Sequence, residues 1–191
     1  ANVLHNCSLT GRFHVSDGYS LSTNIVPDLS FGLLGATCMT HRPYLDLFAQ
    51  QLRHEFLPNQ TPEGKLPQRV MAQALVPMWV YLLYHCTGDR RIPEEFLEMA
   101  ERSCAYMLSR ANADGIPSLV EYDERRMGGG ADWVDWDDQR LSGSPMVFVT
   151  WYWEALRWMA ALERELGRDE LARTYAQRAD SVAAGIQRVY W

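Results

Sequence analysis

The sequence ALVPMWVYLLYH, residues 74–85, is apolar at nearly every position. A helix with apolar residues on all sides is normally buried on all sides, and this run is too short to cross a bilayer. We therefore predict a buried helix over residues 74–85 that ends at Gly88, because glycine favours the left-handed conformation found just past helix ends. Pro77 falls early in this helix, where a missing backbone N–H is tolerated.

The residues that follow form one apolar stripe rather than an apolar surface. Pro93, Glu94 and Glu95 predict a helix start, because proline fits the first turn and acidic side chains favour the positive end of the helix dipole. The stripe repeats at helical spacing and consists of Phe96, Leu97, Ala100, Cys104, Met107 and Leu108. A buried helix is therefore followed, after a short turn, by an amphipathic one.

The same pairing occurs on both sides of this stretch. An apolar helix predicted over residues 28–39 precedes an amphipathic helix over residues 43–56. A helix that starts at Pro145 is apolar over its first half and charged over its second half, and it precedes an amphipathic helix over residues 168–190. The stripe of this last helix is Leu171, Tyr175, Ala179, Val182 and Ile186.

Three buried helices with three amphipathic partners predict an all-α fold of three αα-hairpins. The buried helices form an inner layer and the amphipathic helices an outer layer, as in curved or closed α/α arrays. We expect one hairpin domain over residues 28–191, after an irregular lead-in over residues 1–27 that has turn formers but no helical period.

The lengths of the connectors alternate along the chain. Turns from inner to outer helices are short, whereas the outer-to-inner connectors at residues 58–72 and 111–144 are long. All long connectors must therefore emerge at one end of the array, and long loops on a rigid scaffold often form functional sites. We expect Asp17, Asp28, the Glu63-Gly64-Lys65 turn and residues 132–138 to converge there.

The longest connector contains the sequence GGGADWVDWDD, residues 128–138. Its aspartates form the densest carboxylate cluster in the chain, and aspartate can act as an acid, a base or a metal ligand. Its two tryptophans offer flat faces to apolar or sugar-like surfaces. The candidate catalytic residues are Asp132, Asp135 and Asp28, and the candidate substrate-binding residues are Trp133, Trp136, Asp137, Asp17 and Trp151.

Other interpretations of these residues remain open. The cluster is also compatible with a solvated loop, or with a calcium ion bound by carboxylates of residues 132–138, although the spacing is not that of an EF-hand. Residues 135–138 have the Asp-x-Asp-Asp form of the acid motif in class II terpene cyclases, which are also α/α barrels. Trp151 begins an aromatic run that is more typical of a packed core than of a ligand platform.

Composition excludes several other classes. The formal charge of −6 and the lack of a Lys/Arg-rich run argue against nucleic acid as a partner. No signal peptide and no membrane-spanning run is visible, so we expect a cytoplasmic protein without membrane contact and leave a secreted or periplasmic location open. No nucleotide-binding or serine-hydrolase motif occurs, and apart from calcium no cofactor is expected.

The cysteines and histidines show no metal-binding spacing. The cysteines are Cys7, Cys38, Cys86 and Cys104, and the last three fall in apolar helical runs, which predicts small buried core residues and leaves a disulfide open. The five histidines are interpreted as structural or surface residues.

Four short motifs, taken in order, resemble the catalytic toroid of six-hairpin glycoside hydrolases. They are PNQTPEGKLP at residues 58–67, YHCTGD at residues 84–89, ADW at residues 131–133 and ELGR at residues 165–168. The nearest resemblance is to the α-L-rhamnosidases, followed by the glucosidase and trehalase groups, and it covers most of the chain from Asp28 onward.

This resemblance implies part of an (α/α)6 toroid and inverting hydrolysis of a carbohydrate by two carboxyl groups. It places Asp132 and Trp133 in the acidic and aromatic wall of the sugar pocket, and Asp28 at the start of an inner helix. The chain departs from the family at residues 17–22, which contain Asp17 but no glutamate in place of the Arg-Asp-Glu-Arg-like stretch of the rhamnosidases. Three predicted hairpins are half a ring, so self-association, further chain segments, or a non-catalytic carbohydrate-binding or scaffold domain are the alternatives.

Overall fold

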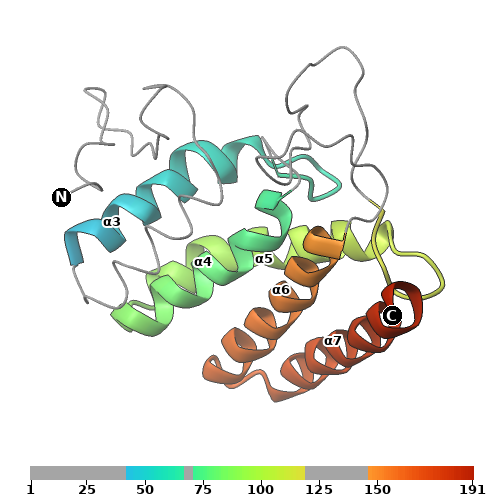
Figure 1. The fold of residues 1–191 in the computed structure, drawn as a ribbon. Helices are drawn as coiled ribbons and strands as arrows, with labels where there is room; N and C mark the ends of the chain where they lie inside the picture. The colour runs from blue at the N-terminus through green and yellow to red at the C-terminus, as the bar shows by residue number, and fades with distance from the viewer. Residues whose placement is uncertain (1–41, 67–70, 119–145) are drawn as a thin grey trace, which may run out of the picture.

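The computed structural model describes residues 42–66, 71–118 and 146–191 (Figure 1). Within these ranges the chain is helical, and its one β-type contact is an isolated bridge between Ala111 and Pro117. The elements are α3 (Arg42–Gln51), the π-helix η1 (Leu52–Phe56), the 3-10 helix η2 (Leu57–Asn59), α4 (Met71–Thr87), α5 (Arg91–Ser109), α6 (Met146–Glu165) and α7 (Asp169–Tyr190). The predicted all-α fold is confirmed, and the predicted helix over residues 28–39 lies outside the described residues.

The described helices form two of the three hairpins that the sequence predicts, and the inner helix of the first lies outside the described residues. Helix α4 packs against α5, and α6 packs against α7. The two inner helices, α4 and α6, also pack against each other, while α3 contacts α4 (Figure 1). The inner helices therefore connect one hairpin to the next, as expected for an array with inner and outer layers.

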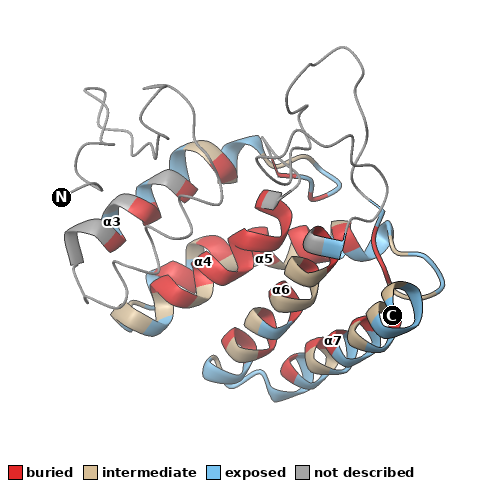
Figure 2. Cartoon of the chain, in the orientation of Figure 1, coloured by how far each residue is buried: buried red, intermediate tan, exposed pale blue. Residues whose placement is uncertain are grey.

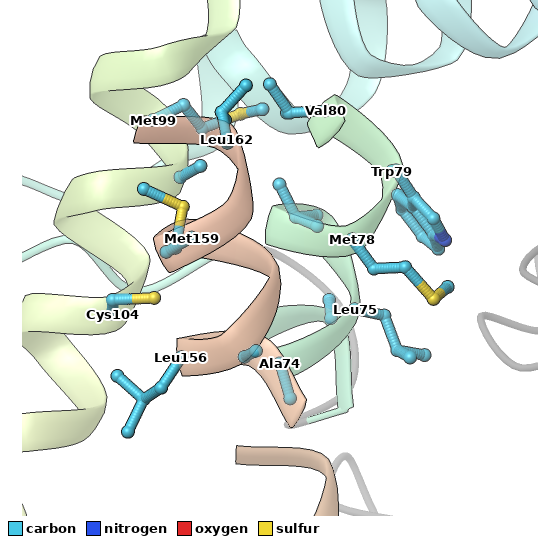
Figure 3. Close-up of a cluster of buried hydrophobic side chains, with 14 of the residues drawn as sticks. Ala74, Leu75, Met78, Trp79, Val80, Met99, Cys104, Leu156, Met159 and Leu162 are labelled. Atoms are coloured by element: carbon cyan, nitrogen blue, oxygen red, sulfur yellow. The ribbon is translucent and has the colours of Figure 1, made fainter. Parts of the chain in front are cut away.

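Helix α4 is the centre of the core. Every residue from Ala72 to Val80 is buried, as the apolar sequence predicts (Figure 2). The indole ring of Trp79 is 1% exposed and meets the Phe56 ring edge-on, with 5.4 Å between the ring centroids. Apolar side chains of α4, α5 and α6 meet in the cluster drawn in Figure 3, which includes Met99, Met159 and Leu162.

Pro77 lies deeper in α4 than the sequence suggests, because the helix begins at Met71. A proline has no N–H to donate to the carbonyl group four residues earlier, which here belongs to Gln73. The Ser103 hydroxyl of α5 donates to this Gln73 carbonyl at 2.8 Å instead. A neighbouring helix thus satisfies the backbone group that the proline leaves without an intrahelical partner.

The Gln73 side chain extends this polar junction to the connector before α4. Its Nε2 donates to the Leu66 carbonyl and its Oε1 accepts from the Leu66 N–H, both at 3.1 Å. Gln73 is 1% exposed and Ser103 0%, so the hydrogen bonds form in a dry environment where unpaired polar groups are costly. The junction therefore fixes the end of the first connector to both α4 and α5.

Helix α5 begins at Arg91, two residues before the predicted start at Pro93. The Asp89 carboxylate accepts the Arg91 N–H at 3.1 Å, which satisfies one free donor of the first turn. Most of the predicted stripe is buried, but Leu97 is half-buried and Leu108 is 36% exposed. The boundary was wrong because a carboxylate before the helix, rather than the proline, marks its start.

The burial of the two cysteines in the described ranges differs. Cys104 is 2% exposed, as predicted for a core residue, and its thiol is free. Cys86 is only half-buried and packs against the edge of the core, so the prediction of full burial was wrong. It lies in the last turn of α4, where the helix leaves the core.

Two positions of the C-terminal hairpin differ from the simple sequence pattern. Glu163, in the charged half of α6, is fully buried. On α7, Leu171 is 38% exposed, whereas Ala172 is buried in the same stripe as Tyr175 and Val182. Ala172, rather than Leu171, lies at the helical spacing that faces α6, so the stripe is shifted by one residue at its start.

Candidate functional site

The two long connectors lie at the same end of the hairpin array. Their described parts, residues 57–66 and 110–118, are close to the start of α6, and the short turns at residues 88–90 and 166–168 lie at the opposite end (Figure 1). For the described part of the chain, this arrangement confirms the prediction of a single loop-bearing end.

The first connector is held by the outer helix α5. Residues 61–65 form a turn in which the Thr61 N–H donates to the Lys65 carbonyl at 2.8 Å. Arg102 of α5 donates from Nη2 to the carbonyls of Thr61 and Pro62, at 2.6 and 3.0 Å. Gln60 donates from Nε2 to the Met99 carbonyl at 3.0 Å. These bonds fix a backbone that has no regular secondary structure.

Glu63 projects from this turn into solvent. The pKa of its carboxyl group is lowered, first because its own backbone N–H donates to it and second because the Thr61 hydroxyl does so. Glu63 is therefore a charged carboxylate at the loop-bearing end.

The second connector begins with a turn that is seated on α7. The Asn112 Oδ1 accepts the N–H groups of Asp114 and Ile116, at 2.9 and 3.0 Å. Ile116 is 1% exposed, and Gly185 of α7 provides the space for the Asp114 carbonyl. The turn therefore has a fixed base, from which the chain continues into residues 119–145 and the aspartate cluster.

Only one of the predicted site residues lies in the described ranges. Trp151 is half-buried near the start of α6 and packs against the core, in agreement with the core interpretation of the aromatic run. The remaining candidates lie outside the described residues, as does the alternative calcium site; these candidates are Asp17, Asp28, Asp132, Trp133, Asp135, Trp136 and Asp137.

The opposite end carries a cluster of polar and aromatic side chains. His85 Nδ1 lies 2.6 Å from Glu165 Oε1, and this contact joins the last turns of α4 and α6. The Tyr81 ring packs against the rings of both His85 and Trp158, with centroid distances of 5.2 and 5.1 Å. The cluster fastens the inner helices at the short-turn end, opposite the described parts of the long connectors.

A groove of about 600 Å³ runs along the flank of α6 next to α7. Trp153, Arg157 and Arg164 line it from α6, and Asp180 lines it from α7. The Arg157 guanidinium lies 4.9 Å from the centroid of the Trp153 ring, in a cation–π contact. The groove was not predicted; the signal for it in the sequence is the helical spacing of Trp153, Arg157 and Arg164.

The described residues limit other classes of function. In these ranges no group of three or more His, Cys, Asp or Glu side chains is placed to bind a metal ion. None of the helices within them combines the length and the apolar character that crossing a bilayer requires.

The residues that position the connectors were not predicted either. Gln73 and Ser103 are polar residues next to apolar ones in the sequence. Because buried polar groups form hydrogen bonds, this pattern indicates a buried hydrogen-bond junction. Gln60 and Gly64 belong to the motif at residues 58–67. In the structure, Gln60 fastens the connector to the Met99 carbonyl of α5, and Gly64 allows the turn to touch the backbone of α5.

The described inner and outer helices are paired, with the long connectors at one end and the short turns at the other, which is the arrangement of an α/α hairpin domain of the six-hairpin glycosidase class. The chain belongs to the family of bacterial alpha-L-rhamnosidase six-hairpin glycosidase domains, whose family model matches residues 31–191. No curated protein and no solved structure matches it. The chain is thus glycoside hydrolase-like, and the resemblance predicted from its motifs is confirmed.

Proposed function

We propose that this chain supplies part of the sugar-binding and catalytic region of a glycoside hydrolase that acts on α-L-rhamnosides. The observation that carries the proposal is the family match over residues 31–191. The position of both described connectors at one end of the array supports it, because sites on rigid scaffolds are commonly built from such loops.

The proposed reaction is inverting hydrolysis by a general acid and a general base. In this mechanism one carboxyl group protonates the leaving oxygen and the other activates water on the opposite face of the sugar, across about 6.5–9.5 Å. Asp132 is the first candidate for one of these carboxyl groups, with Asp135 and Asp28 as the others. Trp133 and Trp136 would stack on the sugar ring.

The remaining predicted residues would orient the substrate. Asp137 and Asp17 can accept hydrogen bonds from sugar hydroxyls, and Trp151 lies at the start of α6, on the side of the molecule where the connectors emerge.

A second candidate function follows from the number of hairpins. The family has six, and the sequence predicts three in this chain. Under this second function, the chain binds carbohydrate at its loop-bearing end, and the second catalytic carboxyl group comes from a further chain segment or from a second copy of the chain. The two functions share the binding site and differ only in turnover.

A panel of aryl glycosides separates them. Purified protein is incubated with p-nitrophenyl α-L-rhamnoside and, for comparison, with the corresponding α-glucoside, and the released phenol is measured. We expect turnover of the rhamnoside, with an inverted anomeric product in the proton NMR spectrum. Binding of L-rhamnose without turnover would favour the second function, and absence of both binding and turnover would contradict the proposal.

A further inference from the structure

A buried carboxyl group without a hydrogen-bond partner lies where α5, α6 and α7 meet at the short-turn end. Glu163 of α6 is 0% exposed, and neither of its carboxylate oxygens accepts a hydrogen bond. The Arg168 Nε lies 3.1 Å from Glu163 Oε2, as an ion pair. Isolated buried charges are costly, so this arrangement needs a further source of stabilisation.

Arg168 is shared with a second acid. Its Nη2 donates to Glu101 Oε1 of α5 at 3.0 Å, so one guanidinium group serves two carboxyl groups. If both acids were ionised, the junction would hold one uncompensated negative charge. Two carboxylates cannot hydrogen-bond to each other, because each is only an acceptor, whereas one proton between them would create a donor.

The other groups around Glu163 do not supply the missing charge or proton. Tyr175 of α7 faces Glu163 and Glu101, and burial raises the pKa of its hydroxyl. Cys104 of α5 adjoins Tyr175, and burial raises the pKa of its thiol to about 12, so both groups are neutral near pH 7. The positive charge of Arg178 of α7 lowers the pKa of both Tyr175 and Cys104, against the larger effect of burial. His85 of α4 pairs with Glu165 of α6 at 2.6 Å rather than with Glu163.

We propose that Glu163 and Glu101 share one proton in the folded protein, and that this proton is part of a pH-sensitive clasp that fastens the α6–α7 turn to α5. The clasp joins the outer helix of one hairpin to the turn of the next. Its components are the two carboxyl groups, the shared proton and Arg168, whose contacts lie at 3.0 and 3.1 Å.

The titration behaviour of Glu163 agrees with this geometry. Burial raises the pKa of its carboxyl group from 4.5 to about 7; Arg168 opposes the rise, and Glu101 adds to it. A raised pKa means that the folded protein binds the proton more tightly than the unfolded chain. The stabilisation is therefore complete below about pH 4.5 and is lost as the pH rises to about 7.

The test is urea unfolding at pH 5, 6, 7 and 8, followed by circular dichroism, for the wild type, Glu163→Gln and Glu154→Gln. Glutamine keeps an N–H donor toward Glu101 but cannot ionise, so Glu163→Gln should lose the wild-type fall in midpoint across this range. The associated change in the wild-type unfolding constant is expected to be on the order of 100-fold. Glu154 is a matched control on the same helix, paired with Arg157 near the surface, and its variant should keep the wild-type pH dependence. Histidines change charge in the same range, so the Glu163 contribution is the difference between variant and wild type.

Infrared spectroscopy of the wild type provides a test that requires no variant. The carbonyl band of a protonated carboxylic acid should persist at pH 6, where exposed glutamates are ionised, and should disappear by pH 8.5. Equal pH slopes for the wild type and Glu163→Gln, or the absence of this band at pH 6, would overturn the proposal.

Discussion

Asparagine in place of Asp132 is expected to lower the turnover of α-L-rhamnosides by about 10²–10⁴-fold, the usual contribution of a general acid or base. Asparagine has nearly the shape of aspartate but neither donates a proton as an acid nor accepts one as a base near neutral pH. If Asp132 contributes to proton transfer, the loss should appear in kcat, while the affinity for L-rhamnose should change much less. Initial rates with p-nitrophenyl α-L-rhamnoside measure the first quantity and calorimetry the second.

Asp114→Asn is the matched control for this prediction. It makes the same chemical change in the same connector, at a side chain that is 40% exposed and paired with Arg188 at 3.1 Å. Exposed ion pairs contribute little to stability, and Asp114 lies in the turn seated on α7, so turnover should stay at the wild-type level. Full turnover by Asp132→Asn would instead transfer the catalytic assignment to Asp135 or Asp28.

Alanine in place of Gly64 is expected to destabilise the protein by about 2–4 kcal/mol, from backbone strain together with a steric clash. Gly64 has a φ of +98°, which side chains rarely adopt, and an added Cβ would overlap the backbone carbonyl of Arg102. Because the obstacle is backbone in the middle of α5, the neighbour cannot move aside easily. Urea unfolding monitored by circular dichroism measures the change in the free energy of unfolding.

Gly88→Ala separates the two causes. Gly88 also has a positive φ, +63°, but an added Cβ there would meet no atom within 4 Å. This variant should therefore lose only about 1 kcal/mol, the cost of the left-handed conformation alone. Equal losses in the two variants would mean that the contact between the 61–65 turn and α5 does not constrain residue 64.

The hairpin architecture was predictable because the burial pattern is a local property of the sequence. An all-apolar run such as residues 74–85 has no polar face to expose, so it must become an inner helix. The position of Pro77 was not predictable in the same way, because the donor that makes it acceptable is Ser103, which comes from a different helix. Local patterns reveal which residues need a partner, but not where the partner comes from.

The residues of the C-terminal hairpin whose burial departs from the sequence pattern have the same cause, namely a partner on a different element. Glu163 stands in the charged half of its helix, a pattern that does not predict burial, yet it is buried and forms an ion pair with Arg168 from the turn before α7. The carboxylate cluster at residues 132–138 was found from composition alone, and its assignment as a site stays a prediction because it lies outside the described residues.

Hydrogen–deuterium exchange with and without L-rhamnose tests the central claim most directly, namely that the loop-bearing end of the hairpin array holds the sugar site. We predict slower exchange in peptides that cover residues 57–66 and 119–145, and unchanged exchange in peptides that cover the short turns at residues 88–90 and 166–168. Slower exchange at the short turns, with residues 119–145 unchanged, would contradict the account.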